Sequence, residues 1–328
     1  MSPRVRVRLL VAAAAVAAAA LVVGVTVLQA EDEQDAQGPS DAASQAPPLE
    51  LGLLLRDDQE ARALRAAERV LEEGRRDAAG VRFEQLLRAD PASVEAAVGA
   101  AIAAWPAGTT ARLRALVAEH PDSGVARLHL GFALLTEGEP EAAEREWREV
   151  ERRDPDSPAA LRAEDVLHPE MASGRPPFVA DLQRPEGLEG LSPERQLELL
   201  RRRAEAGGAE EWLLYGVGLQ RVGRPVSAMD AFLRAAELEP DQPIVQVAAA
   251  VGRFDKDAPA ETFSRLGPLA RAHPRAGVVR YHLGLCLTWI GAVREARRQL
   301  RLALEADEGG FYGREAERLF ERLESVGT

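Results

Sequence analysis

The fold is decided by HPDSGVARLHLGFAL, residues 120–134, and by its near-copy HPRAGVVRYHLGLCL, residues 273–287. The two stretches agree at nine of their fifteen positions, so the chain repeats itself over a long interval. The chain is also rich in Ala, Leu, Arg and Glu, the residues with the highest helix propensity. Together these features predict an all-α chain built from internal repeats.

A shorter repeat surrounds both stretches. In each copy a small residue is followed twelve residues later by alanine, then four later by a large apolar residue, and eight later by proline. The small residues allow two helices to lie close together, and the proline ends the second helix. The copies are Gly131, Ala143, Trp147 and Pro155; Gly216, Ala228, Phe232 and Pro240; Gly284, Ala296 and Leu300, with Glu308 in place of the proline; and Ala67, Ala79, Phe83 and Pro91.

This pattern resembles the tetratricopeptide repeat (TPR) family, whose 34-residue units are helix–turn–helix pairs. The resemblance implies a TPR-like α-solenoid, and the spacing of the copies predicts about seven helical pairs plus a capping helix. The expected divisions are residues 49–167 for the first part of the array, 168–192 for a Pro/Gly-rich insertion, 193–310 for the second part and 311–328 for the C-terminal capping helix.

The N-terminal region predicts a membrane anchor. Residues 9–29 are uncharged and apolar over a length that spans a bilayer as one transmembrane helix. Arginines in residues 1–8 predict a cytoplasmic N-terminus, hence a single-pass cell-membrane protein with an extracytoplasmic array. A cleaved signal peptide is the alternative. Residues 30–48 are acidic and rich in Pro, Gly and Ser, which predicts a flexible linker.

Charge and motifs exclude several classes of function. The net charge of −12 argues against a nucleic-acid partner, because a phosphate backbone needs a basic face. A single cysteine excludes an internal disulfide and a zinc site made from cysteine pairs. The sequence has no nucleophile elbow, phosphate-binding loop or zinc-protease motif. We therefore predict no catalytic residues, no cofactor and no metal.

The TPR resemblance also implies a partner-binding groove. In that family, fixed positions of the first helix of each pair face a concave groove that holds partner segments. An apolar groove with scattered polar groups suits a protein or peptide segment such as an amphipathic helix. Packing against neighbouring helices is the alternative role for the same side chains. The positions are Leu128, His129, Phe132, Leu213, Val217, Tyr281, His282 and Trp289.

The predicted function is a membrane-tethered scaffold for protein–protein interaction in the assembly of envelope complexes, without catalysis of its own. It resembles membrane-anchored repeat proteins of the bacterial envelope. The alternatives are an envelope enzyme or a glycan-binding module that uses the groove around His129 and His282. Within the insertion, residues 175–179 (RPPFV) are the only apolar-aromatic spot, for which disorder, edge packing and partner contact are the alternatives.

Overall fold

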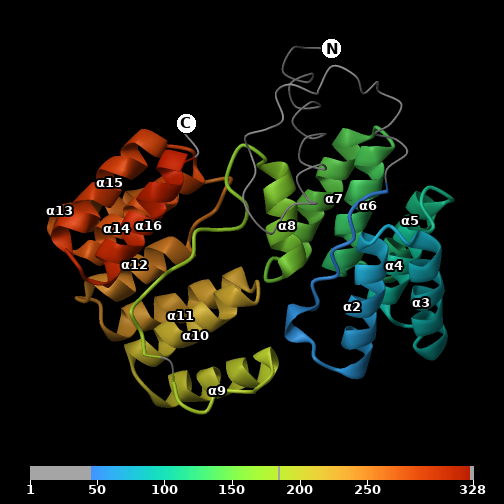
Figure 1. The fold of residues 1–328 in the computed structure, drawn as a ribbon, viewed down its shortest axis with the longest axis horizontal. Coiled ribbons are helices and arrows are strands. Elements are labelled where there is room, and N and C mark those ends of the chain that lie inside the picture. Colours follow the sequence, from blue (N-terminus) through green and yellow to red (C-terminus); the bar gives the residue numbers. More distant parts are fainter. Residues whose placement is uncertain (1–45, 184, 326–328) are drawn as a thin grey trace. The chain divides into compact units, whose positions relative to one another are not determined.

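The computed structural model describes residues 46–183 and 185–325, and all regular structure in these ranges is helical. The chain divides between Pro169 and Glu170 into two units, each with its own buried apolar core. Pairs of antiparallel helices make up both units, as Figure 1 shows. The structure thus has the TPR-like, all-α fold that the repeats predict.

Each unit is a series of helical hairpins. The first unit contains the 3-10 helix η2 (Leu53–Leu55) and the helices α2 (Gln59–Glu72), α3 (Arg76–Ala89), α4 (Val94–Ala103), α5 (Thr109–Glu119), α6 (Gly124–Thr136), α7 (Pro140–Arg153) and α8 (Pro158–Leu167). The second contains α9 (Pro193–Ala206), α10 (Ala209–Arg221), α11 (Pro225–Leu238), α12 (Pro243–Gly252), α13 (Ala260–Ala272), α14 (Gly277–Trp289), α15 (Val293–Ala306) and α16 (Phe311–Ser325).

The turns inside the hairpins follow from their glycines and prolines. Gly138 and Gly223 have φ angles of 83° and 73°, in the left-handed region that glycine adopts without a steric cost. The helices that follow begin at Pro140 and Pro225, where the missing N–H is not needed for the helix. These two hairpins therefore reverse over a few residues, and the two helices of each lie antiparallel.

Small residues let the two helices of a hairpin approach closely, as the repeat predicts. A Cβ atom at Gly131 would collide with the indole ring of Trp147, and one at Gly216 would collide with the ring of Phe232. The Trp147 indole also donates a hydrogen bond to the Leu128 carbonyl at 3.2 Å. Each large ring therefore packs over the glycine of its own hairpin and fixes the distance between the two helices.

The second unit repeats the first, helix by helix. The helices α3 and α11 both have 14 residues, α4 and α12 have 10, α6 and α14 have 13, and α7 and α15 have 14. Equivalent side chains also make equivalent contacts: Arg127 donates to Glu146 at 2.7 Å, and Arg280 donates to Gln299 at 3.0 Å. In this correspondence α2 to α8 match α10 to α16, and α9 has no counterpart.

The number of helical pairs differs from the seven expected. Each unit has three hairpins, and α8, α9 and α16 stand outside them. The helices α8 and α9, which flank residues 168–192, belong to different units: α8 ends the first unit, and α9 opens the helices of the second.

The expected localisation requires a correction. Among the helices of residues 46–183 and 185–325, none has both the length and the apolar character needed to span a bilayer. The prediction of a single-pass cell-membrane protein with an extracytoplasmic array is corrected on this finding. The predicted transmembrane segment, residues 9–29, lies outside the described residues, as do residues 1–8 and 30–45.

Candidate functional site

A segment without α-helix lies against the helices of each unit. We call residues 46–57 the first strap and residues 170–183 the second strap (Figure 1). Both contain two prolines followed by an apolar residue: residues 47–50 are PPLE and residues 176–179 are PPFV. The first proline of each motif, Pro47 or Pro176, is buried. The straps therefore carry the same short pattern in two places of a duplicated fold.

A histidine in each unit binds the strap through its backbone. His129 accepts a hydrogen bond from the Glu50 N–H at Nε2, and His282 accepts one from the Val179 N–H, both at 3.0 Å. These donors hold the same place in the two motifs, directly after the apolar residue. The two histidines are likewise equivalent, since each is the sixth residue of its helix, α6 or α14.

The helix itself orients each imidazole ring. Nδ1 of His129 lies 2.7 Å from the carbonyl oxygen of Val125, and Nδ1 of His282 lies 2.7 Å from that of Val278. A carbonyl only accepts, so Nδ1 carries the proton and Nε2 keeps the lone pair that accepts the strap N–H. Burial lowers the pKa of both histidines to about 4, so both are neutral at pH 7.

Polar side chains bind the backbone of the second strap at several further points. The ammonium of Lys256, the only lysine in the chain, donates to the Ala172 carbonyl at 2.8 Å. Trp289 donates from Nε1 to the Gly174 carbonyl at 3.0 Å, and its own carbonyl accepts from the Ala172 N–H at 3.1 Å. Gln220 of α10 accepts from the Phe178 N–H at 3.1 Å. Loop and helix residues therefore hold this strap mainly by its peptide groups.

Phe178 is the apolar anchor of the second strap. Its side chain is 2% exposed and stacks on the His282 ring at a centroid distance of 5.1 Å. The ring of Phe232 meets it edge-on at 5.2 Å. Burying a phenylalanine side chain contributes about 1.5–3 kcal/mol. Phe178 is therefore the main apolar contribution of this motif to strap binding.

The first strap is bound by charged side chains. Glu68 of α2 accepts from the Leu51 N–H at 3.2 Å, and Arg162 of α8 pairs with the Glu50 carboxylate at 2.8 Å. Burial raises the pKa of Glu50, and the charge of Arg162 opposes that shift. The fourth motif residue is thus ion-paired in the first unit, whereas Val179 of the second unit is uncharged.

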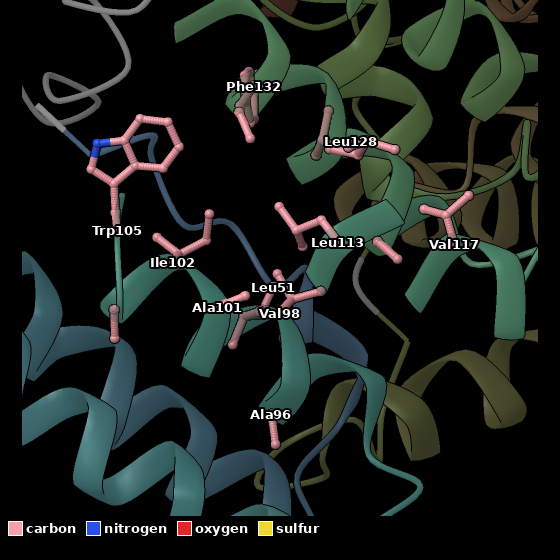
Figure 2. Close-up of a cluster of buried hydrophobic side chains, with 14 of the residues drawn as sticks. Leu51, Ala96, Val98, Ala101, Ile102, Trp105, Leu113, Val117, Leu128 and Phe132 are labelled. Carbon is pink, nitrogen blue, oxygen red and sulfur yellow. The ribbon is translucent and has the colours of Figure 1, made fainter. Parts of the chain in front are cut away.

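The first strap also enters the core of its unit. Leu51 is 4% exposed and belongs to the same buried cluster as the side chains of α4, α5 and α6. Figure 2 shows it beside Val98 and Ala101 of α4. Leu53, two residues later, is buried in that cluster too. The first strap is consequently part of the hydrophobic core as well as a ligand of His129.

The predicted groove residues fall into two groups, one in each unit. In the first unit, His129 meets Phe132 edge-on at 6.0 Å, and Leu128 is buried in the same cluster. In the second unit, Tyr281 meets His282 edge-on at 5.0 Å. The two histidines and Trp289 contact a strap directly. Leu213 is buried in the core of the second unit, and Val217 is half-buried against it.

Several residues that bind the straps were missed by sequence reasoning. Lys256 lies in the loop between α12 and α13, where no periodicity points to it, whereas Gln220 lies on α10 at a groove position of the repeat that the prediction left out. The straps themselves had a signal, the recurrence of two prolines and an apolar residue at 47–49 and 176–178. Only the second of these was noted, as the apolar-aromatic spot of the insertion.

The histidine geometry favours binding over chemistry. Both nitrogens of each imidazole are engaged by backbone groups, Nδ1 by a helix carbonyl and Nε2 by a strap N–H. Within residues 46–183 and 185–325, no three His, Cys, Asp or Glu side chains gather as metal ligands. This arrangement recognises a peptide backbone, and it leaves neither histidine a nitrogen for proton transfer or metal ligation.

Comparison with known proteins finds similarity to solved repeat structures. A human IFIT1 dimer with m7Gppp-AAAA is 16% identical, covering 82% of this chain and 64% of that one, with a TM-score of 0.33. The TPR2AB domain of yeast Sti1 in a pHSP90 complex is 12% identical, covering 81% and 98%, with a TM-score of 0.30. Yeast Tom70 is 13% identical, covering 79% and 47%, with a TM-score of 0.31.

No protein-family model and no curated protein sequence matches this chain. The chain spans slightly less than two thirds of the IFIT1 chain, and about half of the Tom70 chain. At these identities and TM-scores, the likeness does not bear on the function of this chain.

Proposed function

We propose that this chain is a non-enzymatic scaffold that binds another protein through the helix faces on which its straps lie. The single observation that supports this function is that both faces already bind an extended peptide, each through a histidine and its neighbours. The proposed partner is a protein or peptide segment. The binding residues proposed for it are Leu128, His129 and Phe132 in the first unit and Leu213, Val217, Tyr281, His282 and Trp289 in the second.

The chemistry of these faces supports a protein ligand. The neutral acceptors His282 and Gln220 bind peptide N–H groups, the buried Lys256 ammonium binds a peptide carbonyl, and apolar side chains surround them. The net charge of −12 disfavours nucleic acid. No specific observation favours the enzyme or the glycan-binding alternative, because the groove histidines are already bound to backbone groups.

Site-specific photocrosslinking in cells tests the proposed function. We would place a photoreactive residue at Val217, which is half-buried on α10, and compare it with the same residue at Val293, which is 38% exposed on α15. We expect a defined crosslinked partner from Val217 and none from Val293, because only Val217 belongs to the proposed binding face.

The two positions have the same native residue type and lie in the same unit, so Val293 serves as the control position. Circular dichroism would establish that both variants remain helical. An identical set of products from the two positions, or products from Val293 alone, would place the binding face elsewhere.

A further inference from the structure

The two straps present the same recognition pattern to equivalent helices. In both, a buried proline comes first, an apolar residue follows the second proline, and the next N–H donates to a histidine at 3.0 Å. Proline favours the extended backbone that this arrangement needs. Because the pattern recurs in two copies whose other residues differ, it describes a ligand for these helices.

We propose that the site of the second strap recognises an extended Pro-Pro-hydrophobic segment of a partner protein, and that the second strap occupies this site until such a segment replaces it. This inference rests on the proposed function and specifies the partner's chemistry. The free chain would then be self-inhibited at this site.

The second strap has the contacts of an exchangeable ligand. It contains no helix. Pro177 is exposed between the buried Pro176 and Phe178, and Ser173 and Asp181 are exposed on either side of them. The hydrogen bonds at Ala172, Gly174, Phe178 and Val179 use peptide groups, which any partner segment also offers. Attachment to the chain gives the strap a high effective concentration, so an external segment binds with reduced apparent affinity while the strap remains in place.

The first strap is less suited to exchange. Leu51 and Leu53 extend it into the core of its unit, and Arg65 donates to the carbonyls of Leu53 and Arg56 at 2.9 and 2.7 Å. The equivalent residues of the second strap, Ala180 and Leu182, are only partly buried against the core of their unit. We therefore place the exchange in the second unit.

Charge selects among Pro-Pro-hydrophobic segments. In the first unit, Arg162 of α8 binds the glutamate at the fourth motif position. The corresponding residue of α16 is Glu315, which pairs with Arg318 and offers a carboxylate no cationic partner at this position. The second site should therefore prefer a neutral fourth residue, as in Val179, over an acidic one.

The test uses the full chain and a labelled peptide with the sequence of residues 173–183, SGRPPFVADLQ. Phe178→Ala in the chain removes the anchor of the strap and frees the site. By fluorescence anisotropy, we expect the peptide to bind this variant at least tenfold more tightly than the unsubstituted chain.

Two modified peptides test the recognition itself. N-methylation of the peptide at Val179 removes the N–H group whose hydrogen bond His282 accepts, and it should weaken binding about tenfold or more. A peptide with Val179→Glu should also bind more weakly.

Equal binding to both chains, no binding to the variant, or no effect of N-methylation would overturn the proposal. Dimerisation of the Phe178→Ala chain without peptide binding would identify a second copy as the occupant and would also overturn the proposal.

If this variant does not fold, amide hydrogen exchange of the unsubstituted chain tests the proposal instead. Excess peptide should then speed exchange of residues 174–182 at least tenfold while α14 is unchanged, and unchanged strap exchange would refute the proposal. If Val217 crosslinks a partner but the peptide does not bind, the proposed function stands and only this inference is refuted.

Discussion

At the scale of single residues, His129 and His282 combine two roles. Each closes a hydrogen bond with its own helix and accepts one from a strap, and both depend on a neutral ring. Protonation would turn the Nε2 acceptor into a donor facing another donor. Since burial holds the pKa of both near 4, strap binding is stable at neutral pH and weakens in acid.

A pH-dependent stability follows for His282. Unfolded, its pKa returns from about 4 to about 6.5, so between these values the unfolded chain binds more protons than the folded chain. The free energy of unfolding should be fully retained above pH 6.5 and fall as the pH drops toward 4. Between pH 7 and pH 5 this one group contributes a loss of about 2 kcal/mol.

Urea unfolding at pH 7 and pH 5 measures this loss. The difference in the free energy of unfolding between pH 7 and pH 5 should be about 2 kcal/mol smaller in His282→Asn than in the unsubstituted chain. It should persist in Tyr281→Phe, because burial raises the pKa of Tyr281 to about 12, outside this range. An unchanged difference in His282→Asn would show that this histidine is not held neutral by the fold.

At the scale of elements, the helices were predictable and the straps were not. Glycine and proline in the turns at Gly138 to Pro140 and Gly223 to Pro225 mark helix ends locally, and Gly131 opposite Trp147 requires only packing within one hairpin. An extended segment has no periodicity of its own, and its place depends on helices far along the chain: Glu50 meets His129, and Val179 meets His282. The sequence therefore indicated the histidine faces, while their occupants emerged only from the structure.

The first strap should contribute strongly to the stability of its unit. Leu51→Ala removes a side chain that is 4% exposed and should lower the free energy of unfolding by about 2–5 kcal/mol. Leu54→Ala is the matched control in the same segment, because Leu54 is 61% exposed, and should change it by less than about 0.5 kcal/mol. Urea unfolding of both variants provides the measurement. Similar small losses in both would mean that the strap does not belong to the core.

At the scale of the whole molecule, the chain consists of two versions of one strapped unit. Each strap precedes the helices that bind it, so each unit carries its own strap within a continuous stretch of sequence. The second version differs by the added helix α9 and by an aromatic anchor, Phe178, where the first has Leu49. Duplication followed by such changes gives two related sites with different preferences.

This organisation predicts where the chain can be divided. Fragments 46–169 and 170–328 each keep a strap with its helices, and both should be folded and helical by circular dichroism. Fragment 193–328 has the same helices as 170–328 but lacks Phe178 and Leu188, which are 2% and 5% exposed in the intact chain. Losing the buried aromatic anchor costs about 3–5 kcal/mol, so the shorter fragment should melt on the order of 10 °C lower. Equal melting temperatures of the two fragments would show that the second strap adds nothing to the stability of its unit, and that the unit begins at α9.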